Sequence, residues 1–232
     1  MPKKNENYVA LIGDLVASRA LTPKERAEVQ KRFKAVLEKI NKDFKSEITS
    51  LFLITAGDET QGILKRPDCC YEILRQIQID LAPTEIVFGL GFGTLTTDIG
   101  EYAIGADGPA FHLARQALNE AKEERKVYGK SILREVRLLS DMSLLNTVVD
   151  ALFLAVSVLK SHWTDKQTKV LNLLEQRKSP SEIAQLLKIP ESNISRTIEN
   201  SQYREYEFLV NSLESVFKNS IKFNINNKLS KK

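Results

Sequence analysis

The sequence has very few cysteines. The only two are neighbours, Cys69 and Cys70. Adjacent cysteines cannot join distant segments, and they lack the spaced pairs that a zinc site requires. The sequence therefore excludes a disulfide framework and a cysteine-rich metal site, and it predicts a protein of a reducing compartment.

Long apolar runs and a strong excess of charge are also missing. The longest apolar stretch, residues 151–159, is far shorter than the roughly 20 residues that cross a membrane. The residues before Tyr8 are polar and do not form a signal peptide. A net charge of +4 is too small to drive binding to nucleic acid or to a membrane, so any such contact must come from local patches. We expect a soluble, cytoplasmic protein without a membrane partner.

The composition is that of a folded globular protein, with 42% hydrophobic and 28% charged residues. The length of 232 residues suffices for one typical domain and a small helical module. We expect an α/β domain over residues 1–142, a linking helix over 143–163, a helix-turn-helix over 164–202, and a terminal helix with a basic, frayed tail over 203–232.

The first half of the chain alternates strand and helix patterns. The first helix has a clear start, because Thr22 and Glu25 form a capping box around a proline. Glycines in the last strand indicate a close approach of backbone. The pattern predicts an α+β fold with the ferredoxin-like order βαββαβ: strands over residues 8–12, 49–55, 60–64 and 85–93, and helices over 22–44 and 68–81, the second capped by Asp68.

In that order the first and third strands lie side by side and antiparallel. Asp14, after the first strand, and Asp58, before the third, should then converge. Oxygen ligands of this kind favour Mg²⁺ or Mn²⁺, often together with phosphates. The alternative is that each aspartate only ends a strand or opens a turn.

Beyond the first half, a glycine-rich turn leads into a helix that starts near Pro109. Residues 127–139 are ambiguous and fit a strand. An apolar helix over 143–163 should pack on the sheet or on a second subunit. Three short helices follow from Thr164.

Four segments in this order resemble the catalytic domain of class III nucleotidyl cyclases: residues 13–18, 55–59, 89–93 and 105–118. The resemblance implies a palm-like domain that binds a divalent metal and a nucleotide. It implies metal ligands at Asp14, Asp58 and the backbone of Leu15. It implies nucleotide contacts at Ser18, Gly57, Glu59 and Gly108.

The segment 105–118 departs from the cyclase pattern. His112 stands at the position of a catalytic asparagine, and Gln116 at that of the transition-state arginine. Arg115 is one residue away, and one residue on a helix turns a side chain by about 100°. Ile54 occupies the position that reads the base. The resemblance thus implies His112 and Arg115 as candidate catalytic residues in a site whose cyclase activity is altered or absent.

The last third resembles bacterial helix-turn-helix regulators. Ser179 and Glu182 form a capping box, and residues 190–198 fit a recognition helix. The candidate DNA contacts on it are Ser192, Asn193, Ser195 and Arg196. The alternative is a helical packing module, because acidic residues nearly balance the basic ones. Few phosphate contacts would make DNA binding depend on a homodimer or on the basic tail.

The whole chain resembles the SatD family of bacterial proteins, which supplies architecture more than mechanism. The leading hypothesis is a transcriptional regulator in which the cyclase-like domain binds metal and nucleotide and biases how the helix-turn-helix meets DNA. One alternative is an active metal-dependent cyclase or nucleotidyltransferase. Another is a pseudoenzyme that only scaffolds a partner.

Overall fold

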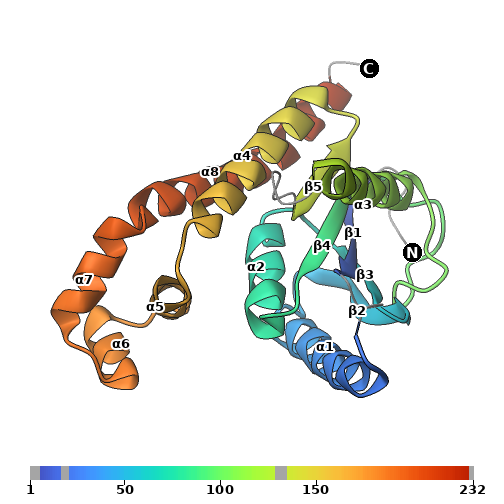
Figure 1. Ribbon diagram of the computed structural model, residues 1–232. Helices are drawn as coiled ribbons and strands as arrows, with labels where there is room; N and C mark the ends of the chain where they lie inside the picture. The colour runs from blue at the N-terminus through green and yellow to red at the C-terminus, as the bar shows by residue number, and fades with distance from the viewer. Residues whose placement is uncertain (1–5, 17–20, 129–134, 230–232) are drawn as a thin grey trace.

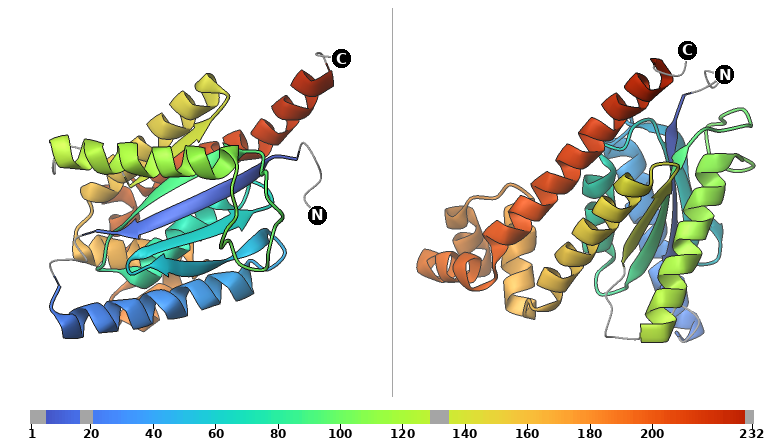
Figure 2. Two further views of the ribbon diagram at one scale, coloured as in Figure 1. Left: turned by 90° about the vertical axis from the view of Figure 1, so that its right-hand side faces the viewer. Right: turned by 90° about the horizontal axis from the view of Figure 1, so that it is seen from above.

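The computed structural model describes residues 6–16, 21–128 and 135–229. A five-stranded sheet forms the centre of the α/β domain, in the order β2-β3-β1-β4-β5, with helices on both faces (Figure 1, Figure 2). The mixed α+β class predicted from the sequence is confirmed. The strands are β1 (Tyr8–Leu15), β2 (Ile48–Ala56), β3 (Glu59–Leu64), β4 (Ile86–Gly93) and β5 (Val136–Ser140).

Strand β1 lies at the middle of the sheet, antiparallel to both β3 and β4. The predicted antiparallel pairing of the first and third strands is thus confirmed. Strand β5 comes from the ambiguous segment and pairs parallel to β4. It extends the sheet by one edge strand beyond the four predicted.

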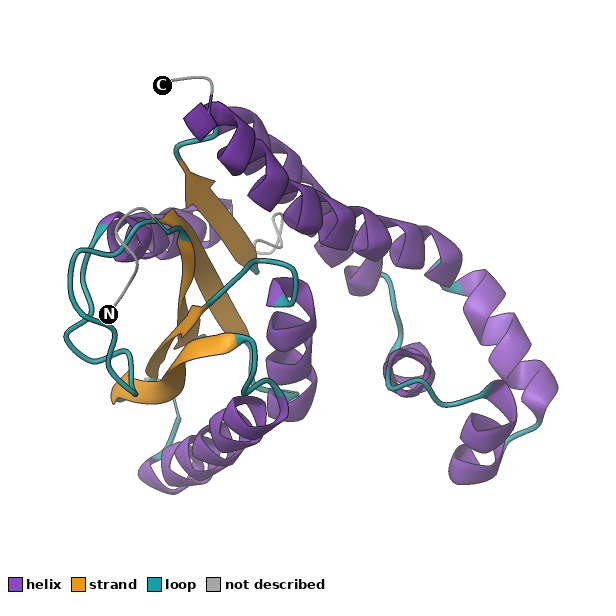
Figure 3. Ribbon diagram, turned by 180° about the vertical axis from the view of Figure 1, so that it is seen from behind, coloured by secondary structure: helices purple, strands orange, loops and turns teal. Residues whose placement is uncertain are grey.

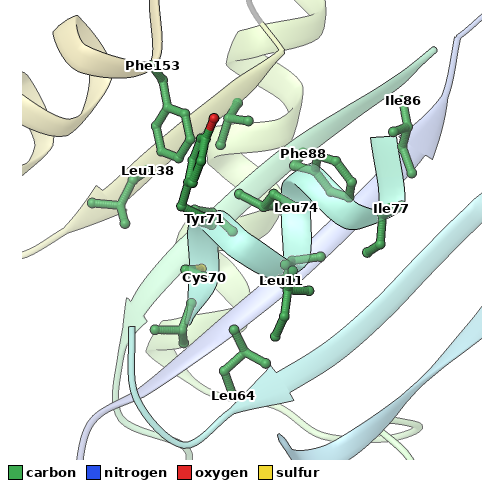
Figure 4. Close-up of a cluster of buried hydrophobic side chains, with 14 of the residues drawn as sticks. Leu11, Leu64, Cys70, Tyr71, Leu74, Ile77, Ile86, Phe88, Leu138 and Phe153 are labelled. Carbon is green, nitrogen blue, oxygen red and sulfur yellow. The ribbon is translucent and has the colours of Figure 1, made fainter. Parts of the chain in front are cut away.

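Side chains alternate between the two faces of β1. Val9, Leu11 and Leu15 belong to the larger core, beneath α1 (Pro23–Asp43) and α2 (Cys70–Leu81). Figure 4 shows part of this core. The other side chains of β1, among them Ala10 and Ile12, belong to a smaller core beneath α3 (Pro109–Tyr128). The sheet is therefore covered on both faces, and the two faces have separate cores.

The starts of α1 and α2 test the capping predictions. Thr22 and Glu25 form the expected reciprocal capping box of α1. The predicted cap of α2 is wrong, because the N-cap residue is Cys69 and makes no side-chain hydrogen bond. Asp68 instead pairs with Arg66, 3.0 Å away, so its carboxylate serves the preceding loop.

Helix α3 lies directly on the backbone of β4. A Cβ atom at Gly91 would come within 1.9 Å of the carbonyl oxygen of Ala110, and one at Gly89 within 2.2 Å of that of Ala114. Only glycine allows this approach, so the prediction that these glycines mark close backbone contact is confirmed. The position of α3 over the sheet is therefore set by backbone contacts.

The apolar helix α4 (Ser143–Ser161) packs against β5 and against the long helix α8 (Tyr203–Leu229). This confirms the prediction that it packs on the sheet domain. By length and composition it is the one helix in the described part of the chain that could cross a membrane. Helix α8 is described as far as Leu229, and the predicted fraying of the tail stays a prediction.

Three short helices, α5 (Asp165–Glu175), α6 (Pro180–Leu187) and α7 (Glu191–Asn200), precede α8. They have a small core of their own, centred on Val170, Ile183 and Ile194. Figure 3 shows α6 and α7 far from the sheet, at the distal end of the long α8. We call α5, α6 and α7 together the three-helix module.

Candidate functional site

The candidate site lies at the end of β1, on the face covered by α3. Asp14 is a residue of the strand itself, where the sequence had placed it in a following turn. It stands opposite Glu59 of β3 in the antiparallel register. By alternation Asp14 shares the face of Ala10 and Ile12, and Glu59 shares that of Ile63. Two carboxylates thus lie side by side under α3.

Helix α3 brings one cation to each of these carboxylates. The guanidinium of Arg115 donates two hydrogen bonds to Glu59, one of them from Nη2 to Oε1 over 2.7 Å. Nζ of Lys122 lies 2.8 Å from Oδ2 of Asp14. Seven residues are about two helical turns, so Arg115 and Lys122 share one face of α3. Together these four residues form what we call the charge cluster.

The charge cluster shifts the pKa values of its own members. The hydrogen bonds from Arg115 hold the pKa of Glu59 below its usual value of 4.5, against the opposing effect of burial. The same bonds raise the pKa of Arg115 above its usual range. Both groups therefore stay charged near neutral pH.

Sequence reasoning missed Lys122. The available signal was its spacing of seven residues from Arg115 on a predicted helix, together with the expected position of that helix over the first strand. Which strand residue each cation meets depends on how α3 is set against β4, and a helical pattern alone does not give that.

Asp58 lies in the β2–β3 turn, where it lines a separate cavity next to α1. This cavity of about 210 Å³ lies between this turn and α1, lined by Asp58, Arg26 and Gln30 among others. Nε2 of Gln30 donates to the carbonyl of Gly57 over 3.0 Å and ties the turn to α1. The backbones of the two predicted metal ligands do meet, because the Leu15 amide donates to the Asp58 carbonyl over 3.0 Å.

A divalent metal needs carboxylate oxygens that converge and are available. The Asp14 carboxylate carries the ammonium of Lys122, whereas Asp58 lines the cavity beside α1. Within the described residues there is no group of three or more His, Cys, Asp or Glu side chains that could hold a metal ion. The predicted metal ligation by Asp14, Leu15 and Asp58 stays a prediction.

The remaining predicted residues lie around the start of α3. Nε2 of His112 lies 2.8 Å from Oδ1 of Asp107, and the amide of Gly108 donates to the same oxygen over 2.8 Å. Gln116 donates to Glu120 along the helix surface. His112 therefore does not belong to the charge cluster. Ser18 lies outside the described residues.

The predicted DNA contacts lie together on α7. The side chains of Ser192, Asn193, Ser195 and Arg196 are all exposed, whereas Ile194 between them is fully buried. The helix therefore turns one apolar residue toward the small core and presents polar side chains to solvent.

Parts of the chain match solved structures at low identity. A bacterial light-regulated adenylyl cyclase matches with 14% identity over 57% of this chain and 74% of that one, at a TM-score of 0.40. The guanylate cyclase domain of RhGC from Catenaria anguillulae matches with 11% identity over 55% and 85%, at 0.39. An EAL/GGDEF domain protein from M. capsulatus matches with 14% identity over 59% and 87%, also at 0.39.

The search of the curated proteins found no match. The model of the SatD family matches residues 8–211, which is most of the chain. This protein therefore belongs to the SatD family.

Proposed function

We propose that this protein is a DNA-binding regulator whose α/β domain binds a nucleoside polyphosphate. The observation that carries the proposal is the three-helix module, which has its own core and exposes a polar face of α7. The order β2-β3-β1-β4, with α1 and α2 on one face, supports reading the α/β domain as a ferredoxin-like, cyclase-like unit extended by β5.

The geometry of α6 and α7 supports a helix-turn-helix. Helix α6 begins with the reciprocal capping box of Ser179 and Glu182, as predicted. It ends at Lys188 in the left-handed conformation, with φ 55°, which turns the chain sharply into α7. The serine, asparagine and arginine side chains on α7 are types that hydrogen-bond base edges and phosphates.

The charge cluster supports nucleotide binding. Arg115 and Lys122 project from one face of α3, and their side chains are 44% and 41% exposed. Both can reach an anion from where they stand, and the strand carboxylates hold them in place. An arginine has five N–H donors and a lysine three, so each can bond a phosphate oxygen and still keep its carboxylate. Charge-assisted hydrogen bonds of this kind to phosphate are strong. The proposal needs no bound metal.

Binding to labelled duplex DNA at low salt, with and without ATP or GTP, tests the regulator. We expect affinity that changes with nucleotide. Arg196→Ala should weaken it about tenfold, the effect of losing about 1.4 kcal/mol. Arg204→Ala on the exposed part of α8 is the matched control and should bind as the native chain does. No DNA binding above background under any condition would refute this function.

Calorimetry with ATP and GTP tests the nucleotide half separately. Arg115→Gln and Lys122→Gln should each weaken binding several-fold, whereas Lys126→Gln, an exposed lysine on the same helix, should not.

Mass analysis after incubation with each triphosphate and Mn²⁺ addresses the enzyme alternative. A cyclic or joined product that is lost in the Asp58→Asn variant would show that the protein is an enzyme and would refute the regulator proposal.

We also propose that the protein acts as a homodimer. Helix-turn-helix proteins commonly bind two half-sites about one helical turn apart, and a second copy doubles the few phosphate contacts that one α7 can make. Sedimentation of the free and DNA-bound protein measures this directly. A single copy on a fully bound site would contradict it.

A further inference from the structure

A cavity of about 200 Å³ lies where the α/β domain meets the C-terminal helices, away from the charge cluster. Its walls come from α2, the start of β4, the end of α3, the end of α4, α5 and α8. We infer that this cavity binds a neutral planar heterocycle with a hydrogen-bonding edge, about the size of one nucleobase. The inference goes beyond the proposed function and does not depend on it.

The charges around the cavity favour a neutral ligand. Three cations line it and each is paired with a carboxylate that also lines it: Arg75 with Glu175 at 3.1 Å, Arg125 with Glu85 at 2.6 Å, and Lys160 with Glu135 at 3.2 Å. Their formal charges cancel. A charged ligand would have to break one of these pairs and leave a partly buried charge without its partner, which is costly.

Two neutral polar groups are available to recognise such a ligand. Thr168 and Asn172 both line the cavity, are half-buried, and lie one helical turn apart on α5. Within the described part of the chain neither side chain makes a hydrogen bond or ion pair. The amide of Gln78, by contrast, is already used by Glu135 and Lys160. A hydroxyl and a carboxamide can pair with a donor–acceptor edge of a ring.

The apolar part of the cavity suits a flat ring. Trp163 lines it and is held in place, because its Nε1 donates to the carbonyl of Ser201 over 2.8 Å. Its indole also packs edge-on against Tyr206, with ring centroids 4.9 Å apart. Ile79 and Ile86 supply further apolar wall. The volume is below the roughly 300 Å³ at which pockets for drug-sized ligands begin, so it limits the ligand to a small ring system.

The indole that lines the cavity is also a reporter. Trp163 is the only tryptophan of the chain, so its fluorescence reports on this place alone. The full-length protein is titrated with adenine, hypoxanthine, cytosine and uracil, and with orotate as the carboxylate counterpart of uracil. We expect a saturable fluorescence change with at least one neutral base, and binding of orotate weaker by about tenfold or more, the effect of about 1.4 kcal/mol.

Variants of the two polar residues on α5 test whether the base binds there. Asn172→Ala and Thr168→Val should each weaken it about tenfold, as expected for the loss of a buried hydrogen bond. Asn211→Ala, at an exposed asparagine of α8, should leave it unchanged. Circular dichroism confirms that each variant is folded, and either variant alone suffices. Arg115→Gln should bind the base normally even if nucleotide and DNA binding are lost.

Three outcomes would overturn the inference. One is no fluorescence change with any of the four neutral bases. Another is native affinity in both folded α5 variants. The third is orotate binding as tightly as uracil, which would show that the ion pairs do not select against charge.

Discussion

The α/β domain and the three-helix module are held together in different ways. The domain has apolar cores on both faces of its sheet, and α3 touches the backbone of β4 through glycines. The core of the module has four buried residues, Val170, Ile183, Ala184 and Ile194, with five partly buried apolar residues packed against them. So small a core contributes little stability by itself, because stability scales with the apolar area that is buried. We therefore expect the module to depend on its attachments to the rest of the chain.

A buried polar network supplies one attachment. Glu175, the last residue of α5, pairs with Arg75 of α2 and accepts a hydrogen bond from the hydroxyl of Tyr206 on α8. That hydroxyl also lies 2.6 Å from the hydroxyl of Tyr71 on α2. Burial raises the pKa of Tyr206 well above its usual value, so it remains a donor at neutral pH. Three helices therefore meet at one carboxylate.

The largest effect on stability should come from adding a side chain between α3 and β4. Gly91→Ala would place a methyl group against the Ala110 carbonyl, and backbone cannot yield as a side chain can. We expect a loss of about 3 kcal/mol or more in the free energy of unfolding, measured by urea denaturation. Gly100→Ala is the control, because its nearest neighbour would be 3.4 Å away. Equal losses in the two variants would contradict the close contact.

A smaller and more local loss of stability should follow from shortening a buried side chain in the core of the three-helix module. Ile194→Ala should cost about 2 to 4 kcal/mol, by lost burial and a residual cavity. Hydrogen exchange should then show α5, α6 and α7 unprotected while β1 and β4 keep native protection. Leu186→Ala, at a side chain that is 58% exposed, should change little. If the strands lose protection together with the module, the two regions form a single cooperative unit.

Removing one hydroxyl tests the attachment itself. Tyr206→Phe leaves Glu175 and the hydroxyl of Tyr71 short of a partner, so we expect a loss of about 1 to 2 kcal/mol. The loss should appear as faster hydrogen exchange in α5. Tyr203→Phe keeps the stacked ring beside Tyr206, and within the described residues its hydroxyl has no hydrogen bond. That variant should behave as the native protein, and a matching loss there would count against the network.

The smallest effect concerns acid stability at the charge cluster. The pKa of Glu59 is lowered in the folded state, so its contribution is present above the unfolded value near 4.5 and is lost as pH falls through the folded value. Arg115→Gln should remove this acid-dependent loss, an effect below about 1 kcal/mol for a partly exposed pair.

Urea midpoints measured from neutral pH to below pH 4.5 compare this variant with the native chain. Lys34→Gln, which breaks only an exposed pair with Glu38, is the control. An unchanged pH profile in Arg115→Gln would mean that the bond to Glu59 does not persist in solution.

Local signals in the sequence predicted much of the fold. Capping boxes located the starts of α1 and α6, and paired glycines marked the contact of α3 with β4. The end of β1 was misplaced because Gly13 looked like a turn residue. The strand continues through Gly13, where a Cβ atom would come within 2.8 Å of the Phe88 ring, so glycine makes room for that ring.

The candidate site was harder to predict. Sequence reasoning expected Asp14 to converge with Asp58, whereas the antiparallel register places Asp14 opposite Glu59. It did not predict which cations face them, because that depends on where α3 lies along β4. That placement is a tertiary property, set by the backbone contacts at Gly89 and Gly91 rather than by any pattern within α3.

The contacts of Gly89 and Gly91 with the backbone of α3 also affect how the side chains of the site can change between relatives. A helix held by main-chain contact cannot slide or roll to accommodate a new side chain on its free edge. Residues 115 and 122 can therefore be exchanged for shorter, neutral or acidic ones while their Cα atoms stay where they are. In relatives that keep glycine at 89 and 91, the charge that α3 offers to a ligand could change from positive to negative by substitution alone, with no rearrangement of the scaffold.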